Sequence, residues 1–299
     1  MIETAQSEIG AIRRLLLKHP REGFKDAESV ERQWRELNYT APPDFNRAID
    51  EYDRFVASLT QNGHATAFLP DASATGLDSI YVRDASVICD RGAIICRMGK
   101  PAREGEPAAH EVAFRALGYP IAGSIAPPGR LEGGDVVWLD RRTIAVGRGY
   151  RTNDAGIAQL RTLLGDSIDD LITVQLPHWK GAADVFHLMS IVSPIDHDLA
   201  VVYSPLMPVA FRELLLHRGT TLVEVPDDEF DSMGTNVLAL APRLCLMLSG
   251  NPITQGRLET AGAQVTTYEG TNISIKGGGG PTCLTRPLLR IDRDENLRQ

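Results

Sequence analysis

The sequence has few cysteines and no cluster of metal-binding residues. Its 299 residues include four cysteines, Cys89, Cys96, Cys245 and Cys283, and no pair is spaced as C-x-x-C. The seven histidines are scattered, without an H-E-x-x-H motif or a Cys/His cluster at zinc spacing. We therefore expect no metal site and no cofactor. Three of the cysteines lie in apolar runs typical of strands, where cysteine behaves as a small hydrophobic residue, so Cys283 alone stands in a different setting.

The chain also lacks a dense basic tract and a long apolar run. Its formal net charge of −8 does not favour binding to phosphate backbones, so nucleic acid is not an expected partner. No stretch approaches the roughly 18 apolar residues of a membrane span, and residues 1–14 lack the pattern of a signal peptide. These absences predict a cytoplasmic protein with no membrane partner. What is present, 43% hydrophobic and 23% charged residues, is typical of a globular protein with a large core.

A pattern of strand, strand, helix and strand recurs four times. In the first copy, "SVICDRGAIICRM" (86–98) has the pattern of a hairpin, and "EPAAHEVAFRALG" (106–118) that of a helix that ends at Gly118. The later copies begin near residues 135, 186 and 236, and their helices are expected at 152–165, 208–217 and 251–262. Such a regular period indicates units that cover one another's apolar faces.

A fifth copy appears if the two ends of the chain are joined. Residues 283–291 and 11–19 would form its hairpin, residues 43–63 its helix and residues 65–69 its last strand. The helix is predicted by apolar residues at spacings of four, three, four and three, namely Phe45, Ile49, Tyr52, Val56 and Leu59. Five α/β units of this kind predict a closed circular array within a single domain, 1–299, because closure leaves no sheet edge exposed.

Chemically reactive side chains occupy the same place in successive units, at or just before the first strand. They are Asp84, Glu132 with Asp135, His187, Asn236 and Cys283, at successive separations of 48, 55, 49 and 47 residues. Equivalent positions in a circular array lie around one axis, so we expect these side chains to converge on one central pocket.

A thiol beside an imidazole is the equipment of covalent catalysis, because the thiolate attacks and histidine transfers protons. The additional acids would by themselves raise the pKa of the cysteine and oppose thiolate formation. They suit a cationic substrate, and a planar guanidinium offers five N–H donors to carboxylates. Each residue taken alone has a structural explanation, and "GGGG" (277–280) alone is more often a flexible loop. Their joint recurrence favours an active site.

Six motifs occur in order, "DSIYVRDAS", "LEGGD", "RTN", "FHLMS", "NVLAL" and "GGGGPTC". Together they resemble the motifs of the guanidine-modifying pentein superfamily, which includes arginine deiminases, dimethylarginine dimethylaminohydrolases and amidinotransferases. The resemblance covers nearly the whole chain. It implies a five-bladed α/β propeller of ββαβ units around a central active site, which agrees with the count of five made from the pattern.

The resemblance also implies roles for single residues. Cys283 is similar to the nucleophile of the superfamily, His187 to its general acid and base, and Glu132 and Asp84 to the carboxylates that hold the guanidinium. Asp78 and Asp135 would support the same pocket. Arg103 and Arg151 resemble the arginines that bind the carboxylate of an amino acid.

Two departures from the motifs bear on the branch. Deiminases and amidinotransferases usually carry an acid two residues after the histidine, where this chain has Met189, so "HLMS" is closer to the dimethylaminohydrolases. Conversely, Arg83 in "VRD" is closer to the deiminases. The branch with the greater resemblance is dimethylarginine dimethylaminohydrolase.

The expected activity is metal-free hydrolysis of arginine or an Nω-methylated arginine to citrulline and ammonia or an alkylamine, through a thiouronium on Cys283. The alternatives are an arginine deiminase proper, an amidinotransferase in which an amine replaces water, and a non-catalytic protein that binds guanidinium groups. The expected partner is a small guanidino molecule, and a homodimer is allowed.

Overall fold

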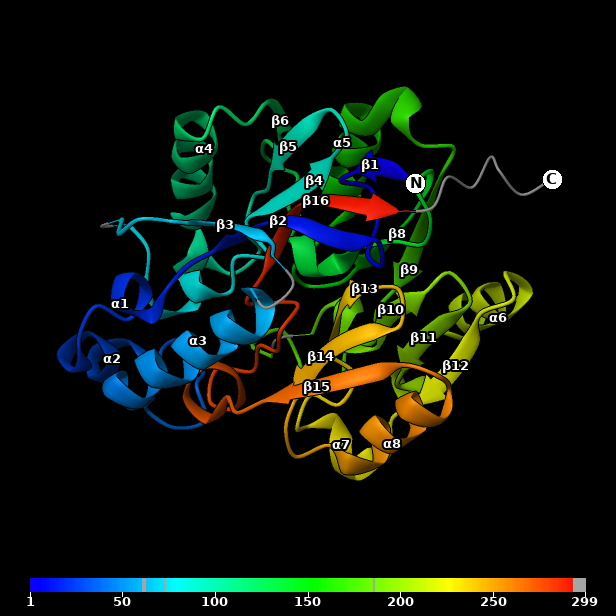
Figure 1. Cartoon of the computed structure of the whole chain (residues 1–299). Helices are drawn as coiled ribbons and strands as arrows, with labels where there is room; N and C mark the ends of the chain where they lie inside the picture. The colour runs from blue at the N-terminus through cyan, green and yellow to red at the C-terminus, as the bar shows by residue number, and fades with distance from the viewer. Residues whose placement is uncertain (61–62, 73, 185, 293–299) are drawn as a thin grey trace.

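The structure is a computed structural model that describes residues 1–60, 63–72, 74–184 and 186–292. These residues form five small β-sheets, and four of the sheets share one design (Figure 1). In each of the four, two strands pair antiparallel and a third pairs parallel after a helical crossover. The predicted order of strand, strand, helix and strand is confirmed in all of them.

The elements of these four units follow in chain order. They are β4 (Ser86–Cys89), β5 (Gly92–Ile95), α4 (Glu106–Ala116) and β6 (Ile121–Ser124); β7 (Val136–Trp138), β8 (Thr143–Arg148), α5 (Asp154–Leu164) and β9 (Asp170–Gln175); β10 (Val192–Asp196), β11 (Leu199–Val202), α6 (Val209–His217) and β12 (Thr221–Glu224); and β13 (Val237–Ala241), β14 (Leu244–Leu248), α8 (Pro252–Thr260) and β15 (Gln264–Tyr268). Short helical turns add η2 (Pro101–Arg103), η4 (Gly165–Ser167), η6 (Ser204–Leu206) and α7 (Asp227–Phe230).

The fifth sheet joins the two ends of the chain. Strand β16 (Arg286–Asp292) pairs antiparallel with β2 (Ala11–Leu17), which pairs parallel with β3 (Ala65–Phe68), as predicted. Strand β1 (Ile2–Thr4) adds an outer edge by pairing with β16, and three residues are too few for a pattern to have predicted it. The first and last segments of the chain therefore lie side by side (Figure 1).

The connection from β2 to β3 carries the helices of this fifth unit. It contains α1 (Pro20–Gly23), α2 (Ala27–Gln33) and the long helix α3 (Phe45–Thr60). Residues 61–62, at the end of the predicted helix, lie outside the described residues. Within α3, Tyr52 and Leu59 are buried as the spacing predicted, and Phe55 is buried where the spacing had placed Val56.

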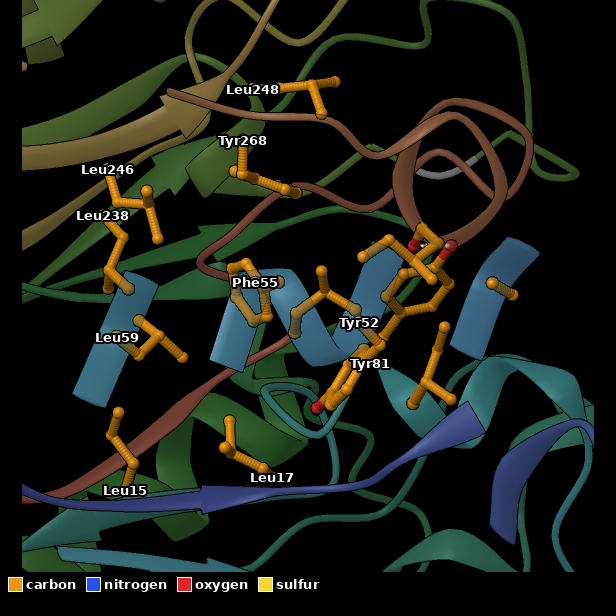
Figure 2. Packing of buried hydrophobic residues seen from close by; sticks show 14 of the residues in the cluster. Leu15, Leu17, Tyr52, Phe55, Leu59, Tyr81, Leu238, Leu246, Leu248 and Tyr268 are labelled. Carbon is orange, nitrogen blue, oxygen red and sulfur yellow. Dashed lines mark hydrogen bonds between the residues drawn. The ribbon is translucent and has the colours of Figure 1, made fainter. Parts of the chain in front are cut away.

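Five hydrophobic clusters close the ring, because each cluster is shared by two neighbouring sheets. The β4–β6 sheet packs on the β7–β9 sheet, and the contacts continue in turn through the β10–β12 and β13–β15 sheets. The sheet of the chain ends contacts the β13–β15 sheet on one side and the β4–β6 sheet on the other. Figure 2 shows the first of these two contacts, where Phe55 and Leu59 of α3 lie between Leu15 of β2 and Leu238 of β13.

Local signals set the ends of the crossover helices. Asn153 caps α5 by accepting a hydrogen bond from the N–H of Gly156, at 2.9 Å. Helix α4 has Pro107 in its first turn and is followed by Gly118 at a φ of 64°. Across the described residues, we find no helix with both the length and the apolar character to cross a membrane.

Candidate active site

Short helical turns precede the first strand of the units and carry the reactive side chains. Turn η1 (Leu77–Ile80) contains Asp78, η3 (Gly133–Asp135) follows Glu132, and η5 (Leu188–Ser190) is capped by His187. The π-helical turn η7 (Thr271–Ile275) leads into the glycine segment before Cys283. Because these turns lie at equivalent places in the ring, the side chains meet near its centre.

Cys283 is half-buried and lies in a turn held by Asn236. The side-chain carbonyl of Asn236 accepts hydrogen bonds from the N–H and the hydroxyl of Thr282, at 3.0 and 2.9 Å. Its Nδ2 donates to the Cys283 sulfur at 3.4 Å. Burial, and then the negative charge of Asp84, raise the pKa of the Cys283 thiol above its ordinary value. The thiol is therefore neutral near pH 7 until a cation enters the pocket.

His187 and Glu132 form a buried pair. The Nε2 of His187 lies 2.7 Å from Oε2 of Glu132, and the backbone N–H of His187 donates to the hydroxyl of Ser190 at 3.1 Å. Burial opposes protonation of His187, but the charges of Asp84 and Asp135 and the hydrogen bond to Glu132 outweigh it and raise its pKa to about 9. His187 therefore carries a proton at neutral pH and can act first as an acid.

Glu132 is saturated with hydrogen bonds from three sides. Its Oε1 accepts the backbone N–H groups of Gly99 and Lys100 at 2.8 and 3.1 Å, and its Oε2 accepts Nη1 of Arg151 at 3.2 Å. Burial favours the neutral acid, yet the bond from His187 and the charge of Arg151 lower the pKa of Glu132 well below its ordinary value. The carboxylate is thus ionised and fixed in orientation.

Asp84 is held between a backbone amide and an arginine. Its Oδ1 accepts the N–H of Gly134 at 3.0 Å, and its Oδ2 accepts Nη1 of Arg103 at 2.5 Å. Burial raises the pKa of Asp84, but the charges of Arg103 and His187 outweigh this and lower it. Gly134 is required for space, since a Cβ there would lie 2.7 Å from Nδ1 of His187 and 2.8 Å from Oδ1 of Asp84.

The two arginines expected to bind a substrate carboxylate differ in their surroundings. Arg103 donates from Nε and Nη2 to Glu106, from Nη1 to Asp84 and from Nη2 to the carbonyl of Tyr81. Arg151 donates to Glu132 and, at 3.5 Å, to the carbonyl of Asp184. The hydrogen bonds of Arg103 therefore serve to orient Asp84, whereas Arg151 also lines a cavity next to the central pocket.

The remaining two acids have contrasting partners. The Oδ2 of Asp78 accepts a hydrogen bond from Nζ of Lys100 at 2.6 Å. Asp135 accepts the N–H of Leu188 through Oδ1, while no described residue donates to its buried Oδ2. Burial raises the pKa of Asp135 to about 6. Asp135 fixes the turn that carries His187 and is not among the residues that line the pocket.

A small central pocket of ≈ 20 Å³ joins these groups. Its lining residues are Asp78, Tyr81, Asp84, Lys100, Arg103, Arg151, His187, Gly277, Gly278, Gly279 and Cys283. Two larger cavities adjoin it. The first, which we name the Arg130 cavity after one of its lining residues, has a volume of ≈ 460 Å³ and shares Lys100 and Arg151 with the pocket. The second, named the Trp179 cavity in the same way, has a volume of ≈ 380 Å³ and shares His187 and Cys283 with the pocket. The thiol of Cys283 can therefore be reached from the Trp179 cavity, whereas the central pocket itself is too small to hold a guanidino substrate unless its side chains shift.

Among the described residues, one group could hold a metal ion. Donor atoms of Asp84, Glu132 and His187 all lie within 4.8 Å of one another. Each of the three already makes hydrogen bonds to protein groups, so a metal would compete with Arg103, Arg151 and with the contact between His187 and Glu132.

The glycine segment 277–280 is packed rather than loose. A Cβ on Gly277 would collide with the hydroxyl of Tyr81 and the ring of Tyr39, and one on Gly279 with the ring of Tyr81. A Cβ on Gly280 would collide with the amide of Asn236. Gly278 has a φ of 74°, which only glycine adopts freely. The glycines therefore let the backbone lie against these side chains and bring Cys283 to the pocket.

Lys100 lines the pocket but was not predicted from the sequence. Lys100 is three residues before Arg103 in "GKPARE", but no motif marked it. Asn236 was identified by its place in the repeat and given no role. Arg83 does not line the pocket, because its side chain points to Glu8 in a buried ion pair, so it has no direct bearing on the substrate.

Comparison with known proteins identifies the family of this chain. Residues 26–290 match the sequence model of the family described as N,N dimethylarginine dimethylhydrolase, eukaryotic. The chain is 31% identical over 250 residues to the N(G),N(G)-dimethylarginine dimethylaminohydrolase of Streptomyces coelicolor, covering 83% of this chain and 88% of that protein. It is 28% identical over 248 residues to the arginine deiminase of Rhodococcus opacus, covering 71% of this chain and 60% of that longer protein.

A solved structure of a dimethylarginine dimethylaminohydrolase has the same fold as this chain. The dimethylarginine dimethylaminohydrolase of Pseudomonas aeruginosa, a mutant complexed with citrulline, superposes with a TM-score of 0.74 at 20% identity, over 92% of this chain and 98% of that one. This similarity confirms the predicted pentein fold, a five-bladed α/β propeller.

Proposed function

The chain belongs to the N,N-dimethylarginine dimethylhydrolase family, and from this premise we propose that it hydrolyses the guanidinium group of arginine or an Nω-methylated arginine through a covalent intermediate on Cys283. The observation that carries the proposal is the convergence of Cys283, His187 and Asp84 on one pocket, with Glu132 bonded to His187. A thiol, a proton donor and two fixed carboxylates are the groups that displacement at a guanidinium carbon needs.

The first step depends on the charge of the substrate. A guanidinium that docks against Asp84 offsets the negative charge that raises the pKa of Cys283, and the thiol loses its proton to solvent. Glu132 is fully buried and does not line the pocket, so it acts through its contact with His187. His187 cannot take that proton, because its own raised pKa keeps it protonated. The thiolate then attacks the central carbon of the guanidinium.

The second and third steps use the two states of His187. The imidazolium donates its proton to the departing ammonia or alkylamine, since an amide anion is too basic to leave, and an S-alkylthiouronium remains on Cys283. The neutral imidazole then takes a proton from water, which attacks the same carbon. The thiolate leaves, citrulline is released and His187 is protonated again.

The other parts of the site have supporting roles in the same proposal. Arg103 orients Asp84, Asn236 holds the turn of Cys283, and Arg151 binds a substrate carboxylate at the edge of the Arg130 cavity. Residues 1–299 act as a single catalytic domain that needs no metal. A cytoplasmic location and a homodimer stay predictions from the sequence.

A colorimetric citrulline assay tests the proposal. Purified protein is incubated with arginine, monomethylarginine and dimethylarginine, and release of ammonia or of methylamines separates deiminase from dimethylaminohydrolase activity. We expect citrulline from at least one substrate and none with Cys283→Ala. The matched control Cys89→Ala, a thiol in β4 that does not line the pocket, should stay active. Failure on all three substrates would contradict the proposal.

A further inference from the structure

We propose that Lys100 is a specificity-determining residue that makes the pocket favour guanidines whose far end is a carboxylate over guanidines whose far end is an ammonium. This inference rests on the proposed function and names the class of substrate that the same site prefers. The favoured class is an ω-guanidino acid, and a free amino acid is intermediate because it carries both groups.

Lys100 has two partners in the protein, and its side chain is 11% exposed. Its Nζ donates to Oδ2 of Asp78 at 2.6 Å and to the backbone carbonyl of Leu37 at 2.9 Å. Asp78 lines the pocket and is itself buried, so it is the acid that could otherwise attract a substrate ammonium. With Lys100 in place, the negative charge of Asp78 is neutralised by the protein.

Lys100 also stands where the central pocket opens into the Arg130 cavity. Lys100 and Arg151 line both spaces, so a chain that extends from the guanidinium site into the Arg130 cavity passes beside them. Three cations, Lys100, Arg130 and Arg151, line the Arg130 cavity against one acid, Glu36. Arg130 has no ion-pair partner within 4 Å among the residues that the structure describes. Because Lys100 is paired with Asp78 and Arg151 with Glu132, Arg130 is the cation of this lining that could attract a carboxylate.

The backbone of Lys100 connects this exit to the catalytic acid. Its N–H donates to Oε1 of Glu132 at 3.1 Å, next to the N–H of Gly99. A substitution of the side chain leaves this N–H in place, so the variant tests the charge of Lys100 separately from the support of Glu132.

The test compares two guanidines of equal length, 5-guanidinopentanoate and agmatine, with arginine as the reference. We expect kcat/KM of the wild-type enzyme to be higher for 5-guanidinopentanoate than for agmatine by about tenfold or more, the size expected of one charge-assisted contact. Lys100→Met frees Asp78 and should lower that ratio by about tenfold or more, while Lys100→Arg should keep it. Lys25→Met, which removes the partner of Asp71 outside the site, is the control and should leave the ratio unchanged.

A second variant covers the case in which Lys100→Met does not fold. Asp78→Asn removes the acid and leaves Lys100 unneutralised, so the ratio should rise. A wild-type preference for agmatine, or an equal loss of activity on both guanidines in Lys100→Met, would overturn the proposal. The latter result would mean that Lys100 is only structural.

Binding to Cys283→Ser separates this inference from the proposed function. Calorimetric titration of that variant with both guanidines measures the preference without turnover. Tighter binding of 5-guanidinopentanoate, together with no hydrolysis of arginine or its methylated forms by the wild type, would support the role of Lys100 and overturn the enzymatic function. Hydrolysis of one of those arginines together with tighter binding of agmatine, or with no binding of either guanidine, would support the enzymatic function and overturn the role of Lys100.

Discussion

At the scale of single residues, the site keeps both Cys283 and His187 protonated, whereas the proposed hydrolysis requires the thiolate form of Cys283. Asp84 raises the pKa of both groups, so the free enzyme holds a neutral thiol beside a protonated imidazole. A cationic substrate would offset the charge of Asp84 and lower both pKa values, and for Cys283 this change favours the thiolate that the proposed mechanism requires. In that mechanism, the thiol is unreactive toward neutral electrophiles and becomes reactive when a guanidinium binds.

Removal of the Asp84 charge should make the thiol more reactive in the absence of substrate. In Asp84→Asn, we expect the pH at which iodoacetamide alkylates Cys283 at half its maximal rate to fall by about one unit. Mass spectrometry of the labelled peptide measures the rate, and Cys283→Ser gives the background. Asp78→Asn, another pocket acid but one paired with Lys100, should give a smaller shift. An unchanged profile in Asp84→Asn would show that burial alone raises the pKa of the thiol.

The proton of His187 should set the alkaline limit of turnover. Its pKa is raised to about 9, so the imidazolium is present below that pH and is lost above it. We expect kcat/KM to fall as the pH rises through about 9. Glu132→Gln should move this fall to lower pH, because the hydrogen bond from Glu132 helps to keep the proton on His187. An alkaline limit unaffected by Glu132→Gln would assign it to another group.

Gly134 offers a test of the fit between the two catalytic groups. In Gly134→Ala, the new methyl group would lie between His187 and Asp84, and one of them must move. We expect kcat/KM to fall by about a hundredfold, since a displacement of about 1 Å has an effect of that size. Circular dichroism should show an unchanged fold. Gly256→Ala, in α8 with no atom within 4 Å of the new Cβ, is the control and should keep full activity.

At the scale of elements, the short turns position the chemistry and the crossover helices stabilise the ring. The turns η3 and η5 each end just before a strand, so the residues next to them are anchored by a sheet on one side. Helix α3 has the further task of packing against two sheets, that of the chain ends and that of β13–β15 (Figure 2).

Truncation of the α3 interface should therefore affect stability rather than chemistry. Phe55→Ala removes a fully buried ring that contacts Tyr268 at a centroid distance of 4.8 Å. We expect it to lower the free energy of unfolding by about 3–5 kcal/mol, measured by urea denaturation. Val112→Ala, at a side chain of α4 that is 65% exposed, should change stability by less than about 0.5 kcal/mol. A small effect of Phe55→Ala would mean that α3 is dispensable for ring closure.

At the scale of the whole molecule, the ring is closed by pairing of the chain ends and by no covalent bond. Ile2 pairs with Asp292, and β16 pairs with β2. Cys283 is three residues before β16, so closure of the ring also brings the proposed nucleophile to the pocket. In the proposed mechanism, folding and catalysis therefore depend on the same long-range contact.

A circular permutant tests this dependence. Residues 299 and 1 are joined by a short glycine and serine linker, and new ends are opened at Gly219, in the exposed turn between α6 and β12, where φ is 80°. We expect a folded and active protein, measured by circular dichroism and citrulline formation. A second permutant opened at Gly278 should lose activity, because the segment that holds Cys283 is released. Loss of folding in the Gly219 permutant would contradict closure through the chain ends.

The sequence by itself determined the five units and predicted the residues proposed to carry the chemistry. Alternating strands and helices follow from local patterns of apolar residues, and the recurrence of Asp84, Glu132, His187 and Cys283 at one place in each unit predicted their convergence. Those signals are local or periodic, so a single sequence contains them in full.

Only the tertiary structure decided which charged side chains pair with one another. That Arg103 orients Asp84, that Lys100 neutralises Asp78 and that Arg83 points to Glu8 depends on side chains from different units. Burial and mutual distance set the pKa values of Cys283 and His187, and neither quantity can be read from the order of residues. The physical reason is that electrostatic interactions act through space, and the folded ring brings together groups that lie far apart along the chain.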